Sequence, residues 1–344
     1  MVDLEIYDYF LPKEKIAQYP ATQRDHSKLM VINKDTIKHR MFYQMIEEIG
    51  AGDVFIVNNS KVIASSLEGQ KETGGRTECV FLREVDPERT IWECILQGRR
   101  LKKDSRIVFL DGRLKGTILN WIKFGQFLIE FNSEVPIQKL LREYASITLP
   151  PYIKAPQQDL SRYQTIYASV EGSIAAPTAG FHFTPELIQK IEKKGAKFVP
   201  VTLHIGYSTF MHLTDEMLSD GQIGEDEYFM IPTDSLTEIQ KCQSENRQLI
   251  AVGTTSLKAL ESAANKEGEI TQLQGWSNLF ISPGYSFKSG VTHMITNFHM
   301  PKAPPLLMVC AFAGKDRIFH AYQEAIAKGY RFYSFGDAMF VDKE

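Results

Sequence analysis

The sequence predicts an α/β (α+β) main domain with a mixed sheet, into which an all-β barrel domain is inserted. Three observations support this prediction. After residue 151, strand-like and helical stretches alternate along the chain, which is typical of α/β proteins. Within residues 77–131, short β-like runs are separated by turns at a spacing that favours a meander or small barrel. The apolar run DVFIVNN precedes that segment and fits a strand of the main sheet, so the β-rich segment is expected to be an insertion.

These observations predict two domains with defined limits. The α/β main domain is expected to comprise residues 1–65 and 151–344, and the inserted β-barrel domain residues 66–150. The β-rich segment is entered through GQKETGG and left through LPPYIKAP, whose three prolines mark a boundary. A chain of 344 residues is long enough for two domains of this size.

The expected barrel strands are five short runs rich in β-branched and aromatic residues. Glycines at positions 98, 112 and 125 mark turns between them. In order, the runs are TECVFLRE, TIWECILQG, SRIVFLDG, LKGTILNW and GQFLIEF.

In the main domain, helix signals and strand signals follow one another. TPELIQKIEKKG predicts a helix with Thr184 as N-cap, Pro185 at the first helical position and Gly195 after its end. VPVTLHI predicts a buried strand, and QLIAVG a second strand that leads directly into the helix TTSLKALESAANKEG. SNLFIS and HMITNF predict further short strands. DRIFHAYQEAIAKG predicts an amphipathic helix that ends at Gly329.

Composition indicates a cytoplasmic globular protein. Apolar residues make up 43% of the chain and charged residues 24%, and no apolar run reaches the roughly 18 residues that a membrane span needs. The N-terminus lacks a basic region followed by an apolar stretch, so no secretory signal is expected. The four cysteines are scattered without metal-ligand spacing, which predicts reduced thiols and no metal site: Cys79, Cys94, Cys242 and Cys310.

The net charge of −3 gives no overall basic field, so any nucleic-acid partner requires a local basic patch. The run GRRLKKDSR in the β-rich segment is such a patch. It could contact RNA, or it could be a solvated hairpin tip. Its cations are Arg99, Arg100, Lys102, Lys103 and Arg106.

Two segments around the predicted helix at Pro185 carry ligand-binding signals. GSIAAPTAGFHF (172–183) is rich in small residues that let a ligand approach the backbone, just before a helix N-terminus with free N–H groups. A tight structural turn would look the same. TLHIGYSTF (202–210) places His204 at the end of an apolar strand, where ligands collect in α/β sheets, although a lone histidine there is more often part of the core.

Three further segments combine hydroxyl, amide and charged groups. AVGTTSLKALE (251–261) places Thr254 and Thr255 at a helix N-terminus, which suits a carboxylate or phosphate or simply caps the helix. TNFHMPKAP (296–304) and GYRFYSFGDAM (329–339) mix polar groups with aromatic ones, as in a surface seam or a site for a cationic or planar ligand. None of these segments has a P-loop, dinucleotide-binding or zinc signature.

Taken in order, the motifs resemble the S-adenosylmethionine:tRNA ribosyltransferase-isomerases of queuosine biosynthesis. The resemblance covers nearly the whole chain. It rests on NNSKVI, KETGG, LPPYI, YQTIYA, GSIAAPTAGFHF, VTLHIGYSTF, AVGTTSLKALES, ITNFHMPK, AFAG and YRFYSFGDAMF. It implies an α/β domain with a β-barrel inserted near residues 66–150.

The resemblance also implies a reaction and its partners. S-adenosylmethionine would be the ribosyl donor, and the acceptor would be 7-aminomethyl-7-deazaguanine at the wobble position of the anticodon loop of a tRNA. The products would be epoxyqueuosine, adenine and methionine. No permanently bound cofactor, metal or membrane partner is implied, and the sequence predicts no oligomeric state.

Combined with the chemistry of the motifs, the resemblance yields candidate site residues. The catalytic candidates are His204, His182, Asp337 and Glu261. The substrate-binding candidates are Asn59, Pro177, Thr178, Gly180, Thr202, Gly206, Thr209, Thr254, Thr255, Asn297, His299, Tyr330 and Arg331.

Several motif positions depart from the pattern usual in the resembled family. They replace arginines, histidines and small or hydroxyl residues of that pattern, and they are Lys61, Ser66, Tyr207, Gln222, Glu225, Lys258 and Pro304–Pro305. Arginine and lysine are not equivalent at a site that binds phosphate or carboxylate through two hydrogen bonds. Two alternatives therefore stand beside the ordinary reaction. One is a diverged paralogue that uses S-adenosylmethionine with another acceptor, and the other is a non-catalytic tRNA-binding protein.

Overall fold

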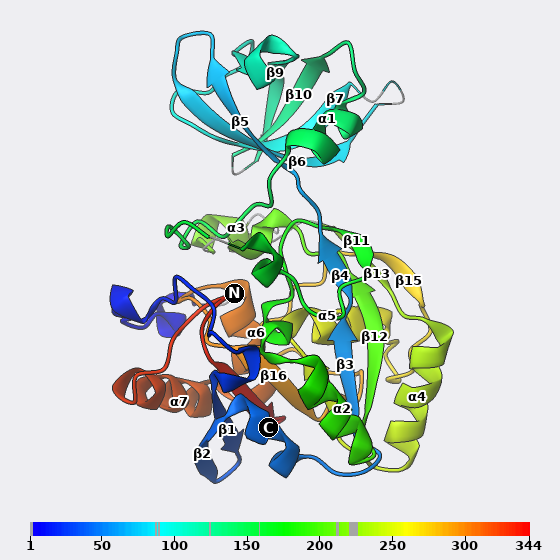
Figure 1. The fold of residues 1–344 in the computed structure, drawn as a ribbon. Coiled ribbons are helices and arrows are strands. Elements are labelled where there is room, and N and C mark those ends of the chain that lie inside the picture. The colour runs from blue at the N-terminus through cyan, green and yellow to red at the C-terminus, as the bar shows by residue number, and fades with distance from the viewer. Residues whose placement is uncertain are drawn as a thin grey trace. The chain divides into compact units, whose positions relative to one another are not determined.

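The computed structural model describes residues 3–86, 88, 90–123, 125–157, 159–210, 213–219 and 226–344. The chain forms two compact units, one of Met1–Lys61 with Pro150–Glu344 and one of Val62–Leu149. The first contains a mixed sheet with helices and the second a closed barrel (Figure 1), which confirms the predicted fold class.

The first unit is built on a nine-stranded sheet. In spatial order its strands are β15 (Gln274–Ser277), β13 (Glu227–Met230), β12 (Lys197–Leu203), β3 (Val54–Asn58), β14 (Leu249–Val252), β16 (His293–Asn297), β17 (Ala338–Asp342), β1 (Lys28–Asn33) and β2 (Thr36–Met41). β12, β3, β14 and β16 are parallel neighbours, and Figure 1 shows β3 beside β12. β3 contains the predicted strand in DVFIVNN, so the N-terminal segment joins this sheet as expected. β11 (Val170–Ser173) and β4 (Ser60–Val62) form a separate pair.

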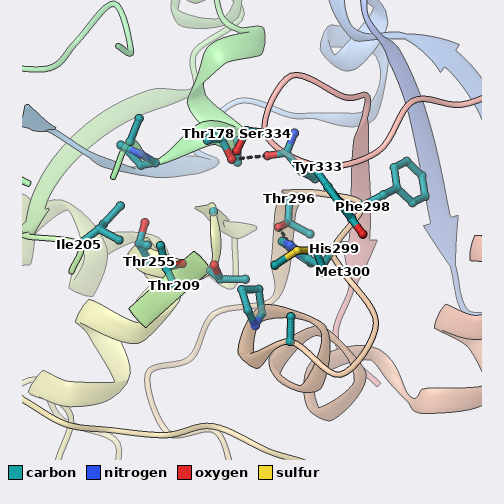
Figure 2. A pocket seen from close by; sticks show the side chains of 18 of the residues that line it. Thr178, Ile205, Thr209, Thr255, Thr296, Phe298, His299, Met300, Tyr333 and Ser334 are labelled. Atoms are coloured by element: carbon teal, nitrogen blue, oxygen red, sulfur yellow. Dashed lines mark hydrogen bonds between the residues drawn. The ribbon is translucent and has the colours of Figure 1, made fainter. Parts of the chain in front are cut away.

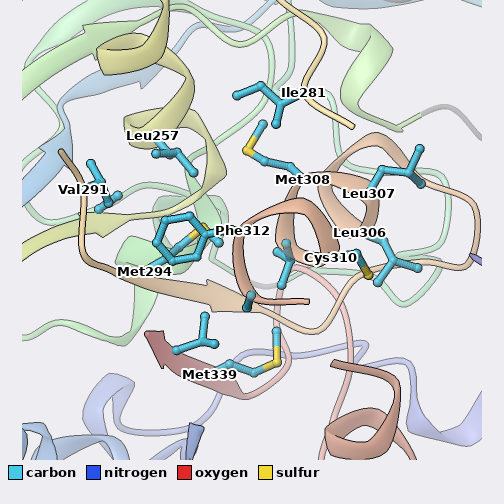
Figure 3. Packing of buried hydrophobic residues seen from close by; sticks show 14 of the residues in the cluster. Leu257, Ile281, Val291, Met294, Leu306, Leu307, Met308, Cys310, Phe312 and Met339 are labelled. Carbon is cyan, nitrogen blue, oxygen red and sulfur yellow. The ribbon is translucent and has the colours of Figure 1, made fainter. Parts of the chain in front are cut away.

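Apolar side chains on the two faces of the sheet build two cores. In β1, Leu29 and Val31 belong to one core and Met30 and Ile32 to the other, because successive residues of a strand point to opposite faces. The first core is covered by α2 (Pro185–Lys193). The second is covered by α3 (Asp215–Ser219), α4 (Thr233–Ser244), α5 (Thr254–Ala263), α6 (Pro304–Ala313) and α7 (Lys315–Ala327). Figure 3 shows Met308 and other α6 side chains packed in this second core.

Most of the predicted helices and strands of this unit are confirmed. α2 begins after Thr184, whose Oγ1 accepts the N–H of Leu187 at 3.1 Å as an N-cap. VPVTLHI contains most of β12, QLIAVG contains β14, HMITNF contains β16, and α7 covers the predicted C-terminal helix. Short 3-10 helices connect these elements at Glu5–Tyr7, Lys13–Lys15, Arg24–His26, Phe42–Glu48, Leu160–Tyr163, Thr178–His182 and Tyr207–Phe210.

Two predicted elements differ from the structure. The helix expected over TTSLKALESAANKEG ends at Ala263, because the side chain of Asn265 accepts the N–H groups of Glu267 and Glu269 and stabilises a turn instead. The strand expected in SNLFIS lies earlier, since β15 ends at Ser277.

The second unit is a closed barrel in which all paired strands are antiparallel. Around the barrel the strands are β10 (Gln126–Asn132), β7 (Ile91–Gln97), β6 (Arg76–Glu84), β5 (Ser66–Lys71), β8 (Arg106–Phe109) and β9 (Leu114–Lys123). A 3-10 helix at Leu110–Gly112 joins β8 to β9, and α1 (Ile137–Tyr144) packs three side chains into the barrel core. The five predicted runs all form barrel strands, and β5 completes the closure.

Three further findings on the described residues concern membrane-spanning helices, metal ligands and thiols. Within them, no helix has both the length and the apolar character required to cross a bilayer. No three histidine, cysteine, aspartate or glutamate side chains of that part of the chain converge as metal ligands. All four cysteines are free and buried.

Candidate functional site

A hollow that is open to solvent lies at the carboxyl ends of the central parallel strands (Figure 2). Gly253–Thr255 follow β14, Phe298–Met300 follow β16, and Ile205 lies just beyond β12; all of these residues line it. This edge of an α/β sheet is where ligands bind, so we take the hollow as the candidate site and call it the cavity. Its other lining residues are Tyr152, Ala176–Ala179, Thr209, Thr296, Asn297, Ala303, Pro305, Tyr333 and Ser334.

On one side of the cavity, the N-terminus of α5 presents Thr254 and Thr255. No side chain caps this helix, so its first N–H groups are available to a ligand. Thr255 Oγ1 accepts a hydrogen bond of 3.2 Å from Nδ2 of Asn58, which also donates to the carbonyl of Leu203 at 2.9 Å. Asn58 therefore holds the threonine in place. Its neighbour Asn59 was the predicted binding residue, and the paired asparagines of NNSKVI were the signal that could have identified Asn58.

A chain of buried hydrogen bonds runs from the cavity into the protein. Thr178 Oγ1 donates to Asn297 Oδ1 at 2.8 Å, a bond drawn in Figure 2. Asn297 Nδ2 lies 3.2 Å from His182 Nε2, and His182 Nδ1 lies 2.7 Å from Ser27 Oγ. Since an amide nitrogen can only donate, His182 Nε2 accepts and Nδ1 carries the proton. Thr178 and Asn297 line the cavity, whereas His182 lies behind them and stacks on Phe42 with ring centroids 5.0 Å apart.

His299 faces the cavity across from Thr255 (Figure 2). Its Nε2 lies 2.8 Å from Thr296 Oγ1, and its backbone N–H donates to the hydroxyl of Tyr322 at 2.9 Å. Burial lowers the pKa of His299 below its ordinary value, so the ring is neutral at physiological pH. A neutral imidazole in a cavity can accept a proton from a substrate.

Tyr152, Tyr333 and Ser334 are among the lining residues that were not predicted. The Tyr152 hydroxyl lies 2.7 Å from Ser334 Oγ, and its ring packs edge-on against Tyr333 at 4.7 Å between centroids. Tyr333 has a φ of 70°, which is uncommon outside glycine, and a Cβ at Gly336 would lie 2.5 Å from the carbonyl oxygen of Arg331. Only glycine fits the end of this turn, which presents Tyr333 and Ser334 to the cavity. The motifs LPPYI and YRFYSFGDAM contained these residues without singling them out.

Other predicted residues lie outside the cavity lining. His204 Nδ1 is 2.7 Å from Ser60 Oγ, which is 2.6 Å from Ser173 Oγ, and the imidazole stacks on Tyr228. Burial lowers the pKa of His204. The neighbouring residue Ile205 lines the cavity, but His204 does not.

Asp337, Arg331 and Tyr330 support the C-terminal turn and also lie outside the cavity lining. The Asp337 carboxylate accepts the backbone N–H groups of Lys28 at 3.0 Å and of Arg331 at 2.8 Å, and lies 3.3 Å from the Arg331 guanidinium. The Tyr330 hydroxyl lies 2.8 Å from His39 Nδ1. These contacts indicate structural roles, so the catalytic role of Asp337 stays a prediction.

Glu261 is a buried residue of α5, and both oxygens of its carboxylate accept hydrogen bonds. It accepts hydrogen bonds from the Tyr285 hydroxyl at 3.1 Å, from the Lys288 N–H at 2.9 Å, and from the Ser289 N–H and hydroxyl at 3.0 and 2.6 Å. It does not line the cavity. Its contacts indicate that it holds the loop before β16, and its catalytic role likewise stays a prediction.

The remaining predicted substrate-binding residues have packing roles. Thr202 donates to Asn59 Oδ1 at 2.7 Å, and both side chains are buried. A Cβ at Gly180 would lie 2.1 Å from the hydroxyl of Tyr167, so this position requires glycine to pack. Of the predicted set, the residues that line the cavity are Pro177, Thr178, Thr209, Thr254, Thr255, Asn297 and His299.

Comparison with known proteins identifies the family of this chain. The model of a family described as queuosine biosynthesis protein matches residues 4–341. The chain belongs to this family. Curated relatives named S-adenosylmethionine:tRNA ribosyltransferase-isomerase include one from Desulfitobacterium hafniense, 44% identical, and one from Halothermothrix orenii, 41% identical. Each alignment covers 98% of this chain and 99% of the relative.

A solved structure resembles this chain as well. It is the crystal structure of S-adenosylmethionine tRNA ribosyltransferase from Thermotoga maritima, 32% identical, with a TM-score of 0.56 over 97% of this chain and 99% of that one. The family membership predicted from the ordered motifs is thus confirmed.

Two lysines at positions where the resemblance predicts arginine are paired within the protein. Lys61 Nζ lies 3.0 Å from Glu171, and Lys258 Nζ lies 2.7 Å from Glu227. Glu227 also accepts the N–H of Gly206 at 3.0 Å, so Lys258 helps to hold the turn after β12. Neither lysine lines the cavity.

The other altered positions are spread over the chain. Ser66, in the barrel, donates to Glu78 at 2.5 Å. Pro304–Pro305 opens α6, and Pro305 lines the cavity with no N–H to offer a ligand. Tyr207 begins the 3-10 helix after β12, and Gln222 and Glu225 fall outside the described residues.

The buried His182 is expected to make the free energy of unfolding fall at acid pH. Burial, and secondarily the charges of Arg331 and Arg24, lower its pKa to about 3, against about 6.5 for the unfolded chain. The unfolded state therefore binds this proton more readily. The free energy of unfolding should fall as the pH drops from about 6.5 toward 3, by at most about 1.4 kcal/mol per pH unit for this group.

Urea unfolding between pH 4 and 7 measures this effect. His182→Gln should flatten the dependence, while the same change at the exposed His320 should leave it as in the wild type. Equal pH dependence in wild type and His182→Gln would contradict the prediction.

Proposed function

We propose that the protein transfers and isomerises the ribosyl unit of S-adenosylmethionine onto 7-aminomethyl-7-deazaguanine in tRNA. Epoxyqueuosine-tRNA, adenine and methionine are the products. The observation that carries the proposal is the cavity at the carboxyl ends of the parallel strands, lined by residues from six of the motifs that place the chain in its family. The names of its relatives, which include S-adenosylmethionine and tRNA, support the same partners.

The chemistry requires a base, a site for charge and exclusion of water. The sulfonium of S-adenosylmethionine acidifies the adjacent 5′-carbon, so a base can remove a proton there to give an ylide. Expulsion of adenine opens the sugar, the amine of the modified base attacks, and methionine leaves. His299 is our candidate base, because its neutral imidazole faces the cavity.

The uncapped N-terminus of α5 suits the carboxylate of the methionine part. Its N–H groups and helix dipole favour an anion, and Thr254 and Thr255 add hydroxyls at the same place. Tyr152 and Tyr333 supply aromatic surface for a planar or cationic group.

Pro305 favours a second candidate function, a diverged paralogue that uses S-adenosylmethionine with another acceptor. The resemblance predicts Ser-Thr where this chain has Pro304–Pro305, so α6 offers the cavity fewer N–H and hydroxyl donors. A non-catalytic tRNA-binding protein is the remaining alternative.

One assay separates these candidates. The protein is incubated with S-adenosylmethionine, with and without tRNA carrying 7-aminomethyl-7-deazaguanine, and both adenine and the modified nucleoside are measured. We expect adenine release that depends on this tRNA. Release only with another acceptor would favour the paralogue, and tRNA binding without any release would favour the non-catalytic protein.

A further inference from the structure

The loop between β7 and β8 of the barrel carries a cluster of exposed cations. Four of them form no ion pair with any described residue: Arg99, Arg100, Lys102 and Lys103. Arg106, at the start of β8, lies 3.7 Å from Glu72, and both side chains are more than half exposed, so this pair neutralises little of the charge. We call residues 99–106 the basic loop.

Three hydrogen bonds support the backbone of the basic loop. Ser105 donates its N–H to the Lys102 carbonyl at 3.0 Å, and Asp104 donates its N–H to the Ile118 carbonyl of β9 at 2.9 Å. Lys71 Nζ donates to the Arg99 carbonyl at 2.7 Å. These hydrogen bonds support the backbone from which the cations extend, and such support reduces the entropy lost when a partner binds.

An exposed tryptophan lies near the basic loop. Trp121 of β9 is 59% exposed and lies three residues beyond Ile118, roughly 10 Å along the strand. The pairing of β9 with β10 shifts register on both sides of Asn120 and Trp121. Such bulges re-aim side chains and are common next to functional sites.

We propose that the basic loop and Trp121 form a docking surface for a single-stranded part of tRNA. Cations that follow the phosphates and an aromatic ring on which a base stacks are the two components with which proteins bind single strands. The charge of the barrel unit also suits a polyanion such as RNA. Residues 62–149 carry 14 lysines and arginines against 12 acidic residues, whereas the whole chain has a net charge of −3. A duplex would offer phosphates but no free base face for Trp121. The choice of tRNA as partner rests on the proposed function.

Equilibrium binding to tRNA carrying 7-aminomethyl-7-deazaguanine, measured with the full-length protein at several salt concentrations, tests the proposal. Changing Arg99, Arg100, Lys102 and Lys103 together to Gln should reduce the slope of log affinity against log salt by about 3, because each phosphate that a cation neutralises adds about 0.7–0.9 to that slope. Trp121→Ala should weaken binding about 5- to 150-fold with the slope unchanged, and Trp121→Phe should restore most of the affinity.

A matched control lies at the other end of β5. Ser66, where β5 begins, pairs with Ser146 just after α1, whereas Lys71, where β5 ends, contacts the basic loop. Changing the exposed Lys139 and Arg142 of α1 to Gln should therefore leave affinity and slope nearly as in the wild type. Thermal unfolding checks that each variant is folded.

The outcomes separate this inference from the proposed reaction. If the variants of the basic loop and of Trp121 bind tRNA as the wild type does, the docking surface is rejected, whether or not adenine is released. If they lose binding as expected while the wild type releases no adenine, the docking surface stands and the proposed reaction is rejected.

Discussion

Replacing Glu261 with alanine is expected to lower the free energy of unfolding of the α/β unit by about 3–5 kcal/mol. The Glu261 carboxylate is 3% exposed and accepts hydrogen bonds from Tyr285, Lys288 and Ser289. Alanine would leave these donors without an acceptor inside the protein, and each buried unsatisfied donor costs about 1–3 kcal/mol. Denaturant unfolding followed by circular dichroism measures the loss.

Two further variants make this result interpretable. Glu267→Ala, at an exposed position shortly after α5, should change stability by no more than about 0.5 kcal/mol. Glu261→Gln keeps the shape and one acceptor oxygen, so it should destabilise less and retain adenine release per folded molecule. If Glu261→Gln is as stable as the wild type but inactive, Glu261 has the catalytic role suggested by the sequence and not the structural role indicated by its contacts.

Much of the fold could be predicted because its local signals agree with its tertiary environment. Thr184 caps α2 as its position before Pro185 predicted, and the five β-like runs all form strands of the closed barrel. α6 was not predicted, because it is apolar on nearly all sides and so has no amphipathic period to recognise. The early end of α5 depends on one side chain, Asn265, that bonds to the backbone after the helix.

The candidate site was harder to predict than the fold, since residue type does not reveal which way a side chain points. Thr255 and His299 follow strands of the parallel sheet and do reach the cavity. His204 also follows such a strand, but its side chain bonds to Ser60 and stacks on Tyr228 outside the cavity lining.

Some cavity residues lie in quoted motifs but could not be singled out from the sequence. Tyr152 and Ser334 are 182 residues apart in the chain and meet only through the fold. No spacing rule applied to a single sequence could pair them. Only the folded structure brings the turn that ends at Gly336 beside the segment that contains Tyr152, so that the two hydroxyls can form their hydrogen bond.

Replacing His299 with glutamine is expected to lower kcat for adenine release by about 10²–10⁴-fold, the range typical of a lost general acid or base. The His299 ring lines the cavity, and burial keeps its pKa below the ordinary value. The neutral form that accepts a proton therefore persists as the pH falls through 6.5, and wild-type turnover should not decline there on account of this group. Glutamine keeps hydrogen-bonding capacity but cannot take up the proton. Single-turnover rates of adenine release between pH 6 and 8 measure the effect.

Two neighbouring changes separate proton transfer from binding. Thr296→Val removes the hydroxyl beside His299 Nε2 and should reduce kcat only about tenfold, because the imidazole remains but loses its orientation. His293 lies on β16, as Thr296 does, but its ring stacks on Phe340 and does not line the cavity. His293→Gln should therefore leave kcat near the wild-type value. If His299→Gln raises KM but leaves kcat unchanged, the imidazole contributes the same binding energy to the ground state and to the transition state. His299 is then not the base. His204, half-buried and bonded to Ser60, would then be the histidine to test next.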